Sequence, residues 1–397
     1  MQFRPLNAPP QVASDDVYDA PGEDWDGLPT TVEPGAGEIA SGRVPAQPID
    51  AEVENWYARD TARRLLALDL IEAQNWIESG SYTASGNAAG GICEAYLMRE
   101  IYTVEGNDED VAISQDGGST WTVDHTVTGA DMKSIAGGPN SVCAICDDGG
   151  SPTTVKKYGV TWTDADQGGT GANTLDCVAW DPFGETYLLG GFGGADGAYF
   201  ATLAEDELAD ATDRSPPTGG DGLFVRFIAP GADRVLFANT ENVYSWDRVS
   251  STSSRTWIVQ STTGGTFVVK SLVYCGTYFY ALVSDGTTSR VYESADGTTW
   301  TRKGAGSVLL GAFTDPITTL AVRGSALLFG GEIATQKRFI VSGDRGETWT
   351  PIHDPIAVRN AGGSAQVIGL VGNRYAAWAY KGAGERVHAL ALRMGPV

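Results

Sequence analysis

The phrase Ser114-Gln-Asp116-Gly-Gly118-Ser-Thr120-Trp121 decides how this chain is organised, because the same pattern returns far along the sequence. It recurs as Ser342-Gly-Asp344-Arg-Gly346-Glu-Thr348-Trp349, and one residue shorter as Ser294-Ala-Asp296-Gly297-Thr-Thr299-Trp300. In each copy the Asp and Ser side chains can bond backbone N–H groups of a tight turn, and Gly accepts the positive φ that the turn requires. Thr and Trp favour the start of a β-strand. We therefore expect each copy to be a structural hairpin.

Weaker copies of the phrase lie between the full ones. Gly159-Val-Thr-Trp162 and Ser254-Arg-Thr-Trp257 keep its end but lack the Asp. The tryptophans follow one another at intervals of roughly 40–50 residues, with one interval of about twice that length, so one copy has been lost near residues 199–212. Pairs of apolar segments open the units near Gly91, Asp131, Thr174, Leu223, Phe267, Ile317 and Ser364. Four short strands in each unit predict an all-β fold, a seven-bladed β-propeller.

The two ends of this array predict how the propeller closes. The last unit ends at Ala389–Arg393, after only three strands, whereas Asn75–Tyr82 before the first unit has the pattern of a strand without a unit of its own. An open ring would expose two sheet edges and promote aggregation. We therefore expect strand 75–82 to complete the last blade, so that residues 75–397 form one closed propeller domain.

The N-terminal part of the chain has a different composition. Residues 1–48 are rich in Pro and acidic residues, with only Arg4 and Arg43 as opposing charges, which predicts an extended arm. Residues 49–74 predict an amphipathic helix. Its apolar stripe consists of Val53, Trp56, Tyr57, Leu65, Leu68 and Ile71. This helix packs either on its own propeller or on a neighbouring subunit, and the sequence leaves both alternatives open.

Charge and cysteine content exclude several classes of function. The net charge of −23 disfavours nucleic-acid and anionic membrane partners, and no apolar run reaches the ~20 residues of a membrane span. The start of the chain shows no secretory signal. The five Cys are odd in number and predict reduced core residues. Cys143 and Cys146 would face opposite sides of a strand, so we expect no metal site and no cofactor.

The repeated phrase resembles the Asp-box, or BNR, repeat of sialidase, xyloglucanase and photosystem-assembly-factor propellers. The resemblance implies that Asp116, Asp296 and Asp344 staple turns on the propeller rim, away from any active site. The Arg-Ile-Pro phrase of sialidases is absent, although Arg226 and Arg323 fall on inner strands where they could face the central channel. No spacing selects a carboxylate pair among Asp147, Asp148, Asp181 and Glu185. Trp180, Phe183, Trp246 and residues 375–380 are either sugar platforms or wedges between blades, and packing is the simpler interpretation.

The order of arm, helix and propeller resembles bacteriophage virion proteins of the neck, tail or fibre. The segments Phe3–Pro10 and Pro48–Trp56 are also similar to such proteins. We therefore expect a non-catalytic structural or attachment protein of a virion, made in the host cytoplasm and present in several copies. Residues 1–74 would bind other virion proteins, and the propeller would be displayed to a cell-surface glycan or receptor. The alternative is a glycan-binding or glycan-hydrolysing, sialidase-like propeller.

Overall fold

The computed structural model describes the strands of the propeller region and many of the turns between them. The described residues are 76–83, 88–95, 100–106, 109–147, 152–158, 161–165, 172–193, 197–205, 212–213, 224–259, 266–304, 315–323, 326–333, 336–352, 365–371, 375–380 and 386–392. The predicted arm (1–48) and helix (49–74) lie outside these residues. No helix in the described part of the chain is long and apolar enough to cross a membrane.

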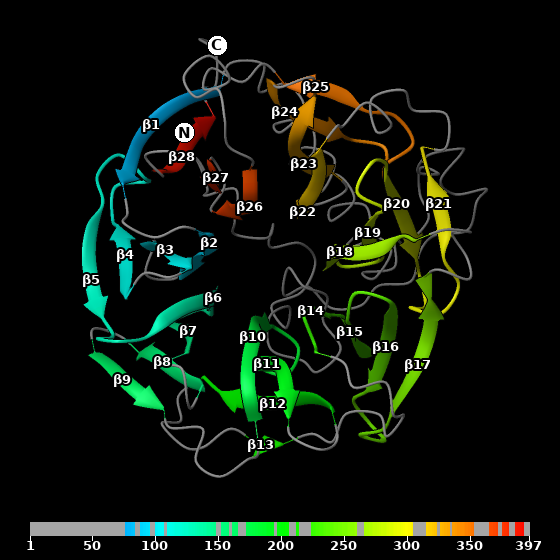
Figure 1. Ribbon diagram of the computed structural model, residues 1–397, viewed down its shortest axis with the longest axis horizontal. Coiled ribbons are helices and arrows are strands. Elements are labelled where there is room, and N and C mark those ends of the chain that lie inside the picture. The colour runs from blue at the N-terminus through cyan, green and yellow to red at the C-terminus, as the bar shows by residue number, and fades with distance from the viewer. Residues whose placement is uncertain are drawn as a thin grey trace, which may run out of the picture.

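The described strands form seven four-stranded antiparallel sheets, which are arranged around a common centre as the blades of a β-propeller (Figure 1). Blade 1 consists of β2 (Ala88–Ala95), β3 (Glu100–Gly106), β4 (Asp110–Ser114) and β5 (Thr122–Thr126). Blade 2 consists of β6 (Asp131–Gly137), β7 (Ser141–Asp147), β8 (Pro152–Tyr158) and β9 (Thr161–Ala165). Blade 3 consists of β10 (Ala172–Asp181), β11 (Thr186–Gly193), β12 (Gly197–Ala204) and β13 (Thr212–Asp213).

The remaining blades repeat this order from the innermost to the outermost strand. Blade 4 consists of β14 (Phe227–Pro230), β15 (Arg234–Ala238), β16 (Asn242–Asp247) and β17 (Ser253–Ile258). Blade 5 consists of β18 (Val268–Tyr274), β19 (Phe279–Ser284), β20 (Ser289–Ser294) and β21 (Thr301–Lys303). Blade 6 consists of β22 (Asp315–Arg323), β23 (Ala326–Ile333), β24 (Gln336–Ser342) and β25 (Thr350–Ile352). Blade 7 consists of β26 (Ala365–Val371), β27 (Tyr375–Tyr380), β28 (Arg386–Leu392) and β1 (Trp76–Thr83).

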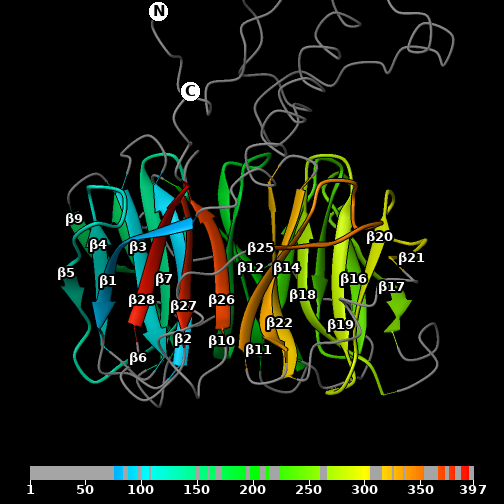
Figure 2. The ribbon, with the colours of Figure 1, turned by 90° about the horizontal axis from the view of Figure 1, so that it is seen from above.

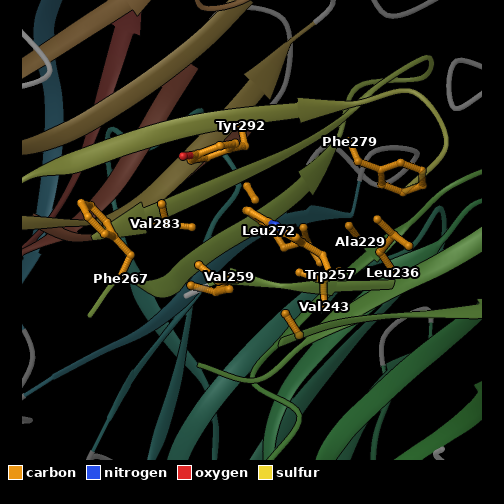
Figure 3. Packing of buried hydrophobic residues seen from close by; sticks show 13 residues of the cluster. Ala229, Leu236, Val243, Trp257, Val259, Phe267, Leu272, Phe279, Val283 and Tyr292 are labelled. Atoms are coloured by element: carbon orange, nitrogen blue, oxygen red, sulfur yellow. The ribbon is translucent and has the colours of Figure 1, made fainter. Parts of the chain in front are cut away.

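The hydrophobic core lies between neighbouring blades. All six residues of β19 are buried, because both faces of this strand are covered by adjacent sheets. One cluster joins blades 4 and 5 through Leu236, Trp257, Leu272 and Tyr292 (Figure 3). Corresponding clusters join blades 1 and 2, 2 and 3, 3 and 4, and 5 and 6. Blades 2 to 5 are thus each stabilised by apolar contacts with the sheets on both sides, and burial of this apolar surface favours the ring.

Strand β1 is the fourth strand of blade 7, the position that we predicted for residues 75–82. It pairs antiparallel with β28 from Trp76 opposite Leu392 to Thr83 opposite Arg386, with a bulge between Glu78 and Gly80. Blade 7 therefore contains the first and the last described strands of the chain, and its outermost strand comes from the N-terminal side. The prediction of an all-β propeller is confirmed.

The antiparallel order gives the ring two distinct faces (Figure 2). We call the face at which the innermost strands begin the front face, and the other the back face. In blade 7, β1 is antiparallel to β28, which is antiparallel to β27, which is antiparallel to β26. Strand β1 therefore runs opposite to the innermost strand β26. It begins at the back face with Trp76 and ends at the front face with Thr83, shortly before β2.

Candidate functional site

The first copy of the repeated phrase forms a self-contained hairpin between β4 and β5. The Ser114 hydroxyl donates to Asp116 Oδ1 (2.9 Å) and accepts a hydrogen bond from the Gly118 N–H (2.7 Å). Asp116 also accepts hydrogen bonds from the Thr120 N–H (2.8 Å) and hydroxyl (2.6 Å). The Trp121 indole N–H donates to the Gly118 carbonyl (3.0 Å). The Ser114, Asp116 and Trp121 side chains are thus hydrogen-bonded within the turn.

The third copy, between β24 and β25, repeats these bonds. The Ser342 hydroxyl donates to Asp344 (2.8 Å) and accepts from the Gly346 N–H (2.7 Å). Thr348 donates to Asp344 through its N–H (2.8 Å) and its hydroxyl (2.5 Å), and the Trp349 indole donates to the Gly346 carbonyl (3.1 Å).

The shorter second copy lies between β20 and β21 and keeps only part of this pattern. Asp296 accepts hydrogen bonds from Ser294 (3.0 Å), from the N–H groups of Thr298 (2.8 Å) and Thr299 (2.7 Å), and from the Thr299 hydroxyl (3.2 Å). The turn contains a left-handed Gly297, with φ of 69°. The Trp300 indole N–H has no hydrogen-bond partner among the described residues, and its ring stacks on Trp257.

These hydrogen bonds favour the ionised carboxylates. Bonds from the Thr120 side chain and backbone lower the pKa of Asp116, and the Thr299 N–H is the main cause of a lowered pKa of Asp296. Burial acts to raise the pKa of Asp344, but the bonds from Thr348 outweigh it and lower that pKa. A carboxyl whose pKa is lowered on folding adds stability above its unfolded pKa of about 4. That stability is lost as the pH falls through the folded value.

We expect Asp344→Ala to lower the free energy of unfolding by about 1–3 kcal/mol at pH 7, because the Thr348 N–H and Ser342 hydroxyl lose their acceptor. Urea denaturation measures the change, and the difference from wild type should shrink as the pH is lowered below about 4. Asp233→Ala is the control, since Asp233 is exposed in the turn between β14 and β15. A loss of ligand binding without a loss of stability in Asp344→Ala would contradict the structural role.

The third hairpin also holds two blades together through Arg345. Its guanidinium donates to both carboxylate oxygens of Glu293 in β20, at 2.9 and 2.6 Å, and lies over the Tyr278 ring. Arg345 has a φ of 62°, at the position where the first hairpin has the left-handed Gly117. A side chain in this backbone region is strained. The ion pair between blades 5 and 6 offsets that strain.

Arg345→Gly tests which of the two effects is larger. The substitution relieves the backbone but leaves the buried Glu293, among the described residues, with Tyr280 (2.7 Å) and the more distant Lys303 (3.7 Å) as side-chain partners. We expect a net loss of about 1–3 kcal/mol, moderated by the partial exposure of Arg345. Combination with Glu293→Gln in a double-mutant cycle isolates the coupling. A coupling near zero would exclude a stabilising ion pair.

The other sequence candidates are mostly structural. Asp181 is buried and accepts hydrogen bonds from Arg248, one of them at 2.7 Å, so it joins blades 3 and 4. Trp246 is buried between these blades, and Trp180 packs against the cluster between blades 2 and 3, as the wedge interpretation predicted.

Cys143 and Cys146 lie in different clusters, on opposite sides of β7, as expected. No group of three or more potential metal ligands occurs in the described residues. Asp148, the side chain of Arg323 and the side chains of residues 375–380 lie outside the described part.

Sequence reasoning found only Arg226 of an arrangement of charged residues at the innermost strands. The pairing of β6, β10 and β18 is interrupted by bulges at Lys133, Asp176 and Lys270. Arg226 occupies the equivalent position in blade 4. Its N–H donates to the Ala238 carbonyl, and the next residue, Phe227, is paired with the same Ala238. Two positions after each of these charged residues the strand has a buried apolar residue, which is Ile135, Val178, Ile228 or Leu272. We call Lys133, Arg226 and Lys270 the axial cations.

The axial cations lie at one level around the ring axis. Strand β10 contacts β6 and β14, and β14 contacts β18 (Figure 1). Arg226 is exposed and the two lysines are half-buried. None of the three forms an ion pair in the described part of the chain. Comparing the starts Lys133-Ser-Ile-Ala and Lys270-Ser-Leu-Val would have revealed the repeat.

Comparisons with known proteins agree on the architecture. No protein-family model and no curated protein matches the chain. Several solved structures match it in fold. YCF48 from Cyanidioschyzon merolae matches at a TM-score of 0.58 and 10% identity, over 80% of this chain and 98% of that one. The chain has a β-propeller fold.

Two enzymes share this fold with a similar degree of structural similarity. A catalytically inactive virginiamycin B lyase from Staphylococcus aureus, with quinupristin, matches at a TM-score of 0.59 and 11% identity, over 80% of this chain and 100% of that one. The Niastella koreensis GH74 enzyme matches at 0.56 and 16% identity, over 78% of this chain and 53% of that one. A second YCF48 structure, bound to D1 peptide, matches at 0.57 and 10% identity, over 78% of this chain and 95% of that one. Likeness at such low identity extends to the fold alone.

Proposed function

We propose that this protein is a non-catalytic structural or attachment component of a virion, in which residues 1–74 anchor a displayed seven-bladed Asp-box propeller. The observation that carries the proposal is the position of β1. This strand is the outermost strand of blade 7, and it connects the propeller to residues 1–75 at the rim of the back face. An anchor attached there leaves the front face open to a partner.

The repeated hairpins support a structural role. Their Asp and Ser side chains are bonded within each turn, and Arg345 uses the third turn to join two blades. A propeller held together in this way suits a protein that carries mechanical load in an assembly. A protein partner is consistent with the peptide-bound YCF48 structure, which has the same fold.

The alternative, a glycan-binding or glycan-hydrolysing propeller, has one observation in its favour. Phe192 and Phe224 stack with ring centroids 4.8 Å apart, and the Arg226 guanidinium lies 5.7 Å from the Phe224 ring. Both rings are half-buried. Aromatic faces beside a cation suit an acidic sugar ring. Turnover or binding of sialosides and glucans by the purified protein would favour this alternative.

Electron microscopy of the purified particle tests the virion proposal. We expect ring-shaped density of the propeller outside the particle body, connected to it from the back face near blade 7. Antibody labelling of the propeller identifies the density. Particles that contain no copy of this chain would refute the proposal.

A further inference from the structure

We propose that blade 7 is a directional clasp. It keeps the ring closed under tension between the N-terminal segment and the front face, and it opens under tension between the two segments that leave the ring at this blade, before residue 76 and after residue 392. The inference rests on the proposed function, in which residues 1–74 hold a propeller whose front face is bound. It starts from β1 and β28, whose pairing closes the ring.

The hydrogen bonds between β1 and β28 point along the radius of the ring. Blade 7 has the order β26, β27, β28, β1 from its innermost to its outermost strand, so β1 lies outside β28 (Figure 1). The hydrogen bonds of an antiparallel pair are perpendicular to the strands and join one strand to the next. A load parallel to the ring axis therefore acts at right angles to these bonds and does not pull the two strands apart.

Tension between the N-terminal segment and the front face is such a load. It enters β1 at Trp76 on the back face, and β1 runs from there to the front face. The tension is shared by all seven residue pairs of the ladder, from Trp76 opposite Leu392 to Thr83 opposite Arg386. Only residues 84–87 separate β1 from β2, the innermost strand of blade 1, so β1 cannot slide far without pulling on β2. Many bonds have to break together, which requires a large force.

Tension between the two segments that leave the ring acts differently. Trp76 and Leu392 are the first pair of the same ladder, and the chain leaves both of them at the back face. This tension pulls the first pair directly apart and then separates the following pairs one at a time. A bulge between Glu78 and Gly80 interrupts the ladder after its third pair. Because each step breaks the bonds of a single pair, a small force opens the blade.

The two geometries favour one way of holding the propeller in an assembly. An attachment through residues 1–74 loads the clasp in its strong direction as long as the chain beyond β28 carries no load. A second attachment through the chain beyond β28 would place the weak direction under tension. We therefore infer that the virion holds this protein from the N-terminal side of β1 alone.

Single-molecule force spectroscopy of the full-length protein tests the proposal. One handle is attached to the N-terminus. The second is attached either to the C-terminus or to p-azidophenylalanine in place of Thr287, which is exposed at the front face between β19 and β20. We expect β1 to be released between the two termini at about one third of the force needed between the N-terminus and position 287, because the pairs break singly in the first geometry and together in the second.

The release of β1 has a defined size. Its eight residues lengthen the stretched chain by roughly 26 Å at about 3.3 Å per residue. An event that occurs at the same force with both positions of the second handle belongs to residues 1–75 and not to the clasp. Pulling between the C-terminus and position 287 is the control, because this load also runs parallel to the axis, and the blade should open only at the higher force.

The variant W76C/L392C provides an independent check. Directly opposite residues of an antiparallel ladder have Cα atoms about 4.5–5.5 Å apart, a distance that a disulfide spans. The oxidised variant should lose the low-force release between the termini, and reduction with dithiothreitol should restore it. Its behaviour between the N-terminus and position 287 should match that of the wild type.

Equal release forces in the two geometries would overturn the proposal, and so would a low-force release that persists between the termini of the oxidised variant. These measurements use the isolated protein. Their failure therefore leaves the particle-labelling result, and with it the proposed function, unaffected.

Discussion

Removal of residues 1–84 is expected to lower the melting temperature by about 10 °C and to cause aggregation, whereas removal of residues 1–74 leaves a folded propeller. The longer truncation deletes β1 and its ladder with β28, from Trp76 opposite Leu392 to Thr83 opposite Arg386. Each lost backbone hydrogen bond costs on the order of 1 kcal/mol, and several such losses shift the melting temperature of a domain of this size by roughly that amount. The exposed edge of β28 then pairs with other chains.

The two truncations form a matched pair, because they differ by only ten residues that include β1. Differential scanning calorimetry measures the melting temperature, and light scattering measures aggregation. A synthetic peptide of residues 75–84 should restore part of the lost stability when added to the longer truncation. Equal melting temperatures of the two proteins would contradict closure by β1.

Deletion of residues 1–48 is expected to abolish incorporation of the protein into virions while the propeller stays folded. In the proposed role these residues bind neighbouring virion proteins, and an extended segment gains contact area when it becomes ordered on a partner. Incorporation is measured by the amount of the protein in purified particles, and folding by the melting temperature. The structural basis for separating the two effects is that closure needs β1, which the deletion retains.

A charge-neutral arm is the control for this deletion. Replacement of the acidic residues in 15–38 by Asn and Gln keeps the length of the arm and separates its charge from its mere presence. Normal incorporation of the protein without residues 1–48 would exclude the anchor. Sialoside or glucan turnover that is the same with and without these residues would support the alternative function.

The repeat made much of the fold predictable from the sequence. Asp116, Asp296 and Asp344 were expected in turns because their residue types fit a tight hairpin, and the hydrogen bonds of each turn are local. Closure was predictable because the strand pattern left one strand over at the start and one missing at the end. The turns follow from local hydrogen-bonding chemistry, and closure follows from the number of strands in the first and last units.

Contacts between blades were not predictable in the same way. Arg345 and Glu293 are 52 residues apart, and Arg248 and Asp181 are 67 residues apart, so no short pattern connects them. The sequence named Asp181 only as one of four acidic residues from which no pair could be selected, and its arginine partner comes from the next blade. The axial cations depend on bulges, and a one-residue change of register is invisible in the alternation of apolar residues.

The pairing of β1 with β28 has a consequence for the order in which the chain matures. On the ribosome, β1 is made before the other six blades, and its partner strand is completed more than three hundred residues later. Blades 1 to 6 contain only strands that follow one another in sequence, so each sheet can form as it is synthesised. β1 alone cannot pair until β28 has been synthesised, so ring closure is the last step of folding. A translation pause or premature stop before β28 therefore leaves a chain with six complete sheets, in which the edges of β1 and β27 that would pair with β28 are exposed to other chains.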